Sequence, residues 1–168
     1  MSASLLPLPQ PVLDVFEHFR TCEFTTINKA GMPSTWPVTP LYLPAEGQFL
    51  LTSSIAMSNK LIHIRRNSHV AMFFSEPKAS GLTNPPIVLV QGDATASDEL
   101  VTSVNRIKPY WRRLMQFQPP SKMWSSTPVM RWLADWYYVR ILTYISPRRI
   151  LWWASGDQSQ PAQMVEVA

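Results

Sequence analysis

Four hydroxyl side chains, one amide and one lysine gather in a short central stretch, and they are the residues best suited to bind an anion. They are Thr52, Ser53, Ser54, Ser58, Asn59 and Lys60. Ser58 is the predicted N-cap of a short helix, whose first turn carries unpaired backbone N–H groups and the positive end of the helix dipole. This combination favours a phosphate. From this stretch alone, an ordinary capped helix with a solvated basic face is the alternative.

The elements on either side position this group. Gln48–Thr52 and Val70–Phe74 are short apolar runs of the length and composition of strands. Between them, Met57, Leu61 and Ile64 recur with the spacing of one helix face, and the lysine lies off that face. The order strand, polar loop, helix, strand therefore places the predicted anion site at the end of a strand.

A second candidate site is the backbone of a strand that contains two prolines. After a predicted turn, the run Ser34–Leu43 forms the second strand of a hairpin. Pro37 and Pro40 each remove a backbone donor, so this strand cannot pair fully on both sides. Backbone groups near Val38 and Thr39 are then open to water or to a ligand. A solvent-facing edge strand protected by its prolines is the alternative.

Gln91 interrupts an otherwise apolar strand predicted over Ile87–Thr95. A glutamine that enters a core strand needs hydrogen-bond partners, either in the backbone or on the edge of a heteroaromatic ligand. Gly92, which follows it, indicates a bulge or a close backbone approach.

Composition excludes several classes of protein. The chain has 168 residues, a net charge of +4, a pI near 9.5 and only 15% charged residues. Its basic residues are scattered and form no recognition motif, so we expect a small anionic ligand and no nucleic acid. The N-terminus is broken by prolines, and no apolar run reaches the length of a membrane span. We expect a cytoplasmic protein that makes no membrane contact.

The few cysteine and histidine residues offer little catalytic chemistry. Cys22 is the single cysteine, which excludes an intramolecular disulfide and fits a reducing compartment. His18 lies four residues before it, but no carboxylate completes a metal site, so none is expected. His18, His63 and His69 are not placed by any motif as general bases and are expected to be structural. The catalytic residues are not identified by the sequence.

The remaining segments predict helices and strands around this centre. The predicted helices are Pro11–Arg20, one capped by Ser97 with Asp98 and Glu99 in its first turn, Tyr110–Phe117 and Thr127–Trp136. The last predicted strands are Tyr137–Ile145 and Ile150–Trp153, separated at Ser146-Pro147, and the polar tail from Gly156 is expected to be loose.

Tryptophan is concentrated in the last third of the chain. Six of the seven tryptophans lie there: Trp111, Trp124, Trp132, Trp136, Trp152 and Trp153. This is more aromatic surface than the core of one small domain readily covers, so we expect a homodimer.

Four motifs, taken in order, resemble those of the FMN-binding split-barrel family typified by pyridoxamine 5′-phosphate oxidase. The resemblance covers about residues 21–154, and its order and spacing carry more weight than any single motif. The motifs are Gly31-Met32-Pro33, T-S-S with S-N-K-L and I-R-R-N-S-H-V-A-M within Thr52–Met72, V-x-V-x-G-x-A in Val88–Ala94, and R-I with P-R-R-I-x-W-W in Arg140–Trp153.

This resemblance implies a mainly β (α+β) fold, a six-stranded antiparallel Greek-key split β-barrel with flanking helices. One domain would span residues 1–168, with its core at about 21–154 and a loose tail at 156–168. The family holds FMN in a cleft at the interface of a homodimer. Carried over to this chain, the cofactor-binding residues would be Pro37, Val38, Thr39, Thr52, Ser53, Ser54, Ser58, Asn59, Lys60, Gln91 and Trp153.

The same resemblance implies an FMN-dependent oxidoreductase that acts on a small-molecule substrate. A non-catalytic protein of this fold, or one that binds the deazaflavin F420 or haem, is the alternative. Trp36 stands where the oxidase itself carries an arginine, and the C-terminal motif of arginine and histidine that grips pyridoxal phosphate has no match. The resemblance therefore does not extend to vitamin B6 oxidation.

Overall fold

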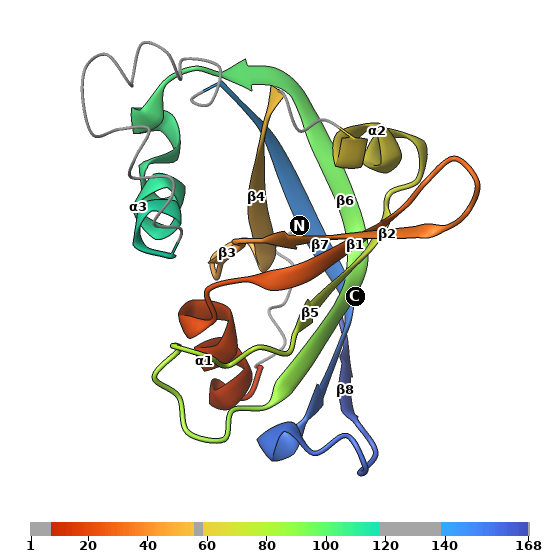
Figure 1. Ribbon diagram of the computed structural model, residues 1–168, viewed down its shortest axis with the longest axis vertical. Helices are drawn as coiled ribbons and strands as arrows, with labels where there is room; N and C mark the ends of the chain where they lie inside the picture. The colour runs from red at the N-terminus through yellow and green to blue at the C-terminus, as the bar shows by residue number, and fades with distance from the viewer. Residues whose placement is uncertain (1–7, 56–58, 118–138, 168) are drawn as a thin grey trace.

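The computed structural model describes residues 8–55, 59–117 and 139–167. Within these ranges the protein is mostly β, with three α-helices and one antiparallel sheet of eight strands (Figure 1). The helices are α1 (Gln10–His18), α2 (Asn59–Arg66) and α3 (Lys108–Phe117), with short 3-10 turns η2 (Val104–Ile107) and η3 (Ala154–Gly156). The strands are β1 (Cys22–Ile27), β2 (Pro33–Val38), β3 (Leu41–Leu43), β4 (Gln48–Ser54), β5 (His69–Phe74), β6 (Ile87–Val101), β7 (Arg140–Trp153) and β8 (Gln163–Glu166).

The sheet curls until its two edges meet at one corner. Its hydrogen-bonded order is β2-β1-β5-β6-β7-β4-β3, with β8 paired to β7. The outermost strands, β2 and β3, are consecutive in the chain and are separated only by Thr39 and Pro40. No ladder joins them in the part of the chain that the structure describes, so the sheet remains open. The expected mainly β, antiparallel fold with flanking helices is confirmed, whereas six strands and a Greek-key barrel are not: the described residues form an open, curled sheet of eight strands.

Two long strands form the spine of this sheet. β6 pairs along almost the whole of β7, while the other side of β7 pairs first with β4 and then with β8. The register of β6 with β7 shifts between Gln91 and Gly92, where β7 carries one extra residue, Arg148, that faces no residue of β6. There the backbone of Ser146 and Pro147 approaches so closely that a Cβ on Gly92 would overlap the Ser146 carbonyl oxygen. The glycine is required by this contact, as its position in an apolar strand suggested.

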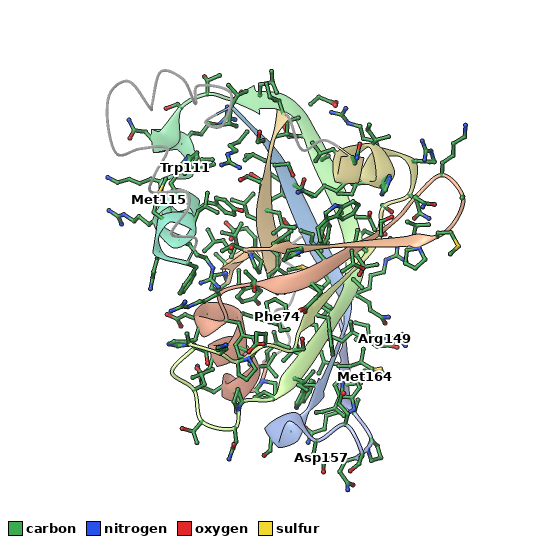
Figure 2. The ribbon with its side chains drawn as sticks, viewed as in Figure 1. Phe74, Trp111, Met115, Arg149, Asp157 and Met164 are labelled. Carbon is green, nitrogen blue, oxygen red and sulfur yellow. The ribbon has the colours of Figure 1, made fainter. Side chains whose placement is uncertain are left out.

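The inner face of the curled sheet holds the main hydrophobic cluster. Alternate residues of the strands enter it, and α1 covers one opening with Val12, Val15 and Phe16. The Phe16 ring packs edge-on against Phe49, with their centroids 4.8 Å apart. Phe74 lies in the same cluster, between α1 and the strands (Figure 2). The helix predicted at Pro11–Arg20 is confirmed, because its apolar residues repeat at helical spacing.

A second cluster lies between α3 and the other face of β4 and β7. Tyr110, Trp111 and Leu114 from α3 pack on Leu50 and Leu142. In Figure 2, Trp111 and Met115 mark this helix, apart from the sheet's inner face. The predicted helical segment at Tyr110–Phe117 is thus confirmed, and it begins two residues earlier, at Lys108.

Three other predicted elements differ from the structure. Residues 97–99 continue β6 to Val101 and do not begin a helix, because pairing of Leu100 with Ile141 extends the ladder past the second irregularity in β6. β7 runs through Ser146-Pro147 as one strand, since the extra residue Arg148 is accommodated as a bulge between the pairs Gly92–Pro147 and Gln91–Arg149. The tail expected to be loose forms β8, which pairs along Arg149–Trp152.

Several predictions fall partly or wholly outside the described residues. These include the Ser58 cap, Met57 and the helix expected over Thr127–Trp136. Of the predicted face of α2, Leu61 and Ile64 are buried as expected. In the described ranges, no helix is long and apolar enough to span a membrane.

Candidate functional site

The end of β4 brings the predicted hydroxyls beside the start of β7. Ser54 pairs in register with Arg140, and Thr52 pairs with Leu142. Adjacent strand residues point to opposite faces, so Thr52 and Ser54 share the face of Arg140, whereas Ser53 points inward with the core. The predicted hydroxyl side chains therefore fall on two faces of the sheet: Thr52 and Ser54 lie on the face of Arg140, and Ser53 lies on the opposite face.

Lys60, in the first turn of α2, lies close enough to Arg140 for their charges to interact. Lys60 is half-buried, while Arg140 is buried and stacks on the ring of Trp111 at 4.8 Å. Burial lowers the pKa of Lys60 from its ordinary value, and the positive charge of Arg140 lowers this pKa further. Lys60 has no ion-pair partner among the described residues. Two neighbouring cations, one of them without a counter-charge, favour an anion between them.

Buried hydroxyl oxygens at this end of the sheet support the same assignment. Thr52 Oγ1 and Ser53 Oγ are buried and make no hydrogen bond to any described residue. Buried hydroxyls normally have a partner, so an unpartnered oxygen on the Arg140 face fits a bound anion. Thr52 fits a phosphate ligand in this way. Ser53 is directed toward the core and does not fit the same role.

The proline-containing strand behaves as an edge strand with one occupied carbonyl. Within the described residues β2 pairs only with β1, and Pro37 is exposed while Val38 and Thr39 are buried. The Tyr110 hydroxyl donates a 3.0 Å hydrogen bond to the Thr39 carbonyl. The expectation that backbone groups near Thr39 are open is therefore wrong for that carbonyl, because Tyr110 of α3 is hydrogen-bonded to it.

Gln91 and Trp153 lie far from this group in the same chain. Gln91 Oε1 accepts a 3.0 Å hydrogen bond from Arg149 Nε, so its partner is a side chain and not the backbone. Trp153 ends β7, whereas Arg140 begins it. At about 3.3 Å per residue the two ends are on the order of 40 Å apart along the strand. One chain does not bring all the predicted cofactor-binding residues together.

The three histidines have neighbours that account for them structurally. His63 Nδ1 lies 2.9 Å from the buried Thr26 hydroxyl, and His18 Nδ1 lies 2.9 Å from the Asp14 carbonyl oxygen. His69 Nδ1 lies 2.9 Å from an oxygen of Asp93. Hydrogen bonds from Ser68 first, and then from His69 and Arg148, lower the pKa of the Asp93 carboxyl.

Sequence reasoning missed Arg140 and Tyr110. Arg140 stood in a motif, but only the register of β4 with β7 shows that it lies opposite Ser54. Tyr110 is 71 residues from Thr39, and nothing in the local sequence indicates their hydrogen bond.

No protein-family model matches the sequence, and no curated protein matches it. Solved structures do match across nearly the whole chain. A pyridoxamine 5′-phosphate oxidase-related, FMN-binding protein from Nostoc punctiforme superposes with a TM-score of 0.60 at 15% identity, covering 98% of this chain and 99% of that one. General stress protein 26 from Bacillus anthracis gives a TM-score of 0.59 at 12% identity, covering 94% and 96% of the two chains.

The chain has the pyridoxamine 5′-phosphate oxidase-like fold. An F420 reductase shares this oxidase-like fold with a TM-score of 0.58 at 17% identity, covering 85% of this chain and 98% of that one. At identities of 12 to 17%, these structural similarities establish the shared fold and do not extend to function. The residues at the end of β4 and the start of α2 must carry any conclusion about the ligand.

Proposed function

We propose that this protein is an FMN-dependent oxidoreductase that acts on a small molecule. The observation that carries the proposal is the half-buried Lys60, which has no ion-pair partner in the described ranges and lies near Arg140, whose face of the sheet also presents the buried Thr52 hydroxyl. An FMN phosphate supplies the negative charge and the acceptor oxygens that Lys60 and Thr52 lack among the described residues. The oxidase-like fold, which the FMN-binding protein of Nostoc punctiforme shares, supports the same choice.

The residues of this chain would bind and orient the cofactor. Lys60 and Thr52 would hold the phosphate, with Ser54 and Asn59 beside them and Ser58 outside the described residues. Val38 would border the isoalloxazine edge together with Pro37 and the Thr39 side chain. Bound FMN supplies the redox chemistry, and the protein contributes position, charge and exclusion of water.

We further propose that the working unit is a homodimer in which two chains share each cofactor. Along β7, Trp153 lies on the order of 40 Å from Arg140, and Gln91 pairs with Arg149, on the order of 30 Å from Arg140. Thr52 and Lys60 of the same chain do not reach these positions. A second copy can bring its own Gln91 and Trp153 to the phosphate-binding residues of the first. The contact between Gln91 and Arg149 would then border the flavin from the partner side.

The absorbance spectrum of the freshly purified protein tests the cofactor. We expect isoalloxazine bands and release of FMN, without FAD, on denaturation, because the proposed Lys60 site suits a single phosphate and the sequence shows no diphosphate-binding loop. Colourless protein that also fails to take up added FMN would contradict the proposal. A screen for flavin reduction by nicotinamide donors then separates an enzyme from a flavin-binding protein without turnover.

F420 is the second candidate, and the similarity to an F420 reductase favours it. F420 also carries a phosphate, so the Lys60 site suits both cofactors. Parallel titrations with FMN, F420 and haem, followed by absorbance, distinguish the three. Tight uptake of F420 with weak uptake of FMN would replace the flavin assignment and leave the anion site unchanged.

A further inference from the structure

A cavity of about 840 Å³ lies between α1, β3 and α3, and it shares no lining residue with the Lys60 site. These three elements stand together on one side of the molecule, with α3 above α1 in Figure 1. The cavity is large enough for a small organic molecule. Its walls are apolar in part, with Leu13 and Phe16 from α1, Leu41 and Tyr42 from β3, and Phe117 from α3.

Two exposed arginines at this cavity carry positive charge that no described carboxylate pairs with. Arg20 and Arg112 both line it, and neither has a hydrogen bond or ion pair to another described residue. Glu17 is the one acidic residue among the described lining residues. Arg113 also lines the cavity, but its guanidinium is already bonded to the carbonyls at the end of α1. Arg20 and Arg112 therefore remain available to a ligand.

We propose that this cavity binds an amphipathic organic anion, a molecule with a carboxylate or sulfonate head and an apolar ring or acyl body. The apolar wall accounts for the body, because burial of carbon surface drives association. The two guanidinium groups account for the head, since arginine forms paired hydrogen bonds with planar oxyanions. A neutral ligand would leave this charge unmatched, and inorganic phosphate would leave the apolar wall exposed to water.

This inference goes beyond the proposed flavin function and does not depend on it. The cavity could hold the anion whether or not FMN binds at Lys60, because the two sets of residues are separate. Direct binding, and not turnover, is therefore the appropriate measurement.

Two fluorescent probes of similar size test the proposal on the full-length protein. 1-Anilinonaphthalene-8-sulfonate carries the anionic head, and N-phenyl-1-naphthylamine is its neutral counterpart. We expect the sulfonate probe to saturate at one site per chain, and dodecanoate to displace it more effectively than dodecanol. Arg112→Gln and Arg20→Gln should each weaken the sulfonate probe about three- to tenfold, the scale of one partly exposed charge contact. The neutral probe should bind these variants and the wild type alike.

Arg66→Gln is the matched control, because Arg66 is exposed at the end of α2 and does not line the cavity. It should leave the affinity of both probes unchanged, as should Lys60→Ala. Equal weakening by Arg66→Gln would show attraction to general positive charge and overturn the proposal. Unchanged affinity in the Arg20→Gln, Arg112→Gln double variant would also overturn it. Displacement of the sulfonate probe by saturating FMN would show that the two sites are one, which contradicts the assignment of a separate cavity.

Discussion

Lys60 is the residue on which the proposed phosphate site most directly depends, because its ammonium has no partner in the described part of the chain. We expect Lys60→Ala to weaken FMN binding by about 1.5–3 kcal/mol, the scale of a hydrogen bond to a charged group, or roughly ten- to a hundredfold in affinity. Riboflavin lacks the phosphate, so it should bind the wild type and the variant about equally. Titration of both ligands by flavin fluorescence measures the difference.

The matched control for this experiment is Lys29→Ala, which removes an exposed lysine from the turn between β1 and β2. It should change neither affinity. If Lys60→Ala lowered the affinity for riboflavin as much as that for FMN, or lowered neither, the phosphate would not lie at this residue.

The lowered pKa of Lys60 also makes a prediction about the flavin-free protein. Between the folded pKa and the unfolded value near 10.4, the unfolded chain binds more protons at this residue, so the contribution of Lys60 to stability rises with pH. Lys60→Met removes that contribution. We expect the free energy of unfolding of the variant minus that of the wild type to be greatest at neutral pH and to decrease toward pH 10.

Urea unfolding of both flavin-free proteins at pH 7 and at pH 10 measures this change. Because Met and Lys also differ in packing, only the pH dependence of the difference is diagnostic. A difference in the free energy of unfolding that stays constant over this range would show that Lys60 has an ordinary pKa when folded.

At the scale of elements, Arg113 joins α3 to the end of α1. Its guanidinium donates hydrogen bonds of 2.7, 2.8 and 3.0 Å to the carbonyl oxygens of Glu17, Phe16 and Phe19. These carbonyls lie at the negative end of the α1 dipole, where a cation is stabilising. Burial lowers the pKa of Arg113, as expected of a guanidinium enclosed between two helices.

Arg113→Gln should therefore lower the free energy of unfolding by about 2–3 kcal/mol, because three charged hydrogen bonds are lost and the partly buried carbonyls of Phe16 and Phe19 are left without this donor. Arg112→Gln changes the neighbouring, exposed arginine and should lie within about 0.5 kcal/mol of the wild type. Chemical denaturation of the two variants tests the prediction. Similar values for both would mean that the link between α1 and α3 does not contribute to stability.

The close approach of β7 to Gly92 in β6 offers a second prediction at this scale. Gly92→Ala places a Cβ against the Ser146 carbonyl oxygen and the Pro147 Cα, both backbone atoms that cannot rotate away. The two long strands would have to separate locally, and we expect a loss of about 2–4 kcal/mol, within the range for overpacking and broken ladder bonds. Thr95→Ala, at an exposed position of the same strand, is the control. A thermal melt within two or three degrees of the wild type for Gly92→Ala would rule out the close approach.

For the whole molecule, the outer face of the sheet near β8 is the surface that we expect to form the proposed dimer. The register places Phe73, Leu89, Leu151 and Met164 in one row across β5, β6, β7 and β8. The first three belong to neither described hydrophobic cluster, and Met164 is 49% exposed. Figure 2 shows Arg149 and Met164 together on the side of the sheet away from α3.

We expect a dimer by light scattering at micromolar concentrations, with one FMN per chain. Met164→Lys introduces a charge into the apolar row and should shift the protein toward the monomer and reduce FMN uptake together. Lys78→Met, at an exposed loop position, is a control that should do neither. Monomeric wild-type protein that still binds FMN tightly would remove the shared-site proposal while leaving the Lys60 site in place.

Local patterns in the sequence predicted much of this fold. The helical spacing of Val12, Val15 and Phe16 and the turn at Gly31 correctly indicated α1 and the first hairpin. Gly92 was expected at a bulge or a close backbone approach, and it lies at a close approach to Ser146, beside the register shift between β6 and β7. The order of the motifs indicated the oxidase-like fold. All of these signals could be read from the sequence because each depends only on neighbouring residues or on the order of motifs along the chain.

What local patterns did not predict depends on pairing between distant segments. Ser97, Asp98 and Glu99 are typical of a helix start, yet they lie within β6, because Ala96 before them and Leu100 after them both pair with β7. The polar tail became β8 because β7 offered an unpaired edge beyond β4.

The candidate site divides in the same way. Residue types alone indicated that Thr52 and Lys60 would suit an anion, since hydroxyl and ammonium groups keep that chemistry in any fold. Only the tertiary structure shows that Arg140 lies near Lys60, that Ser53 points toward the core and that the Tyr110 hydroxyl donates a hydrogen bond to the Thr39 carbonyl. Strand register and helix packing decide which distant groups meet, and they are set by the burial of the whole chain rather than by any local stretch.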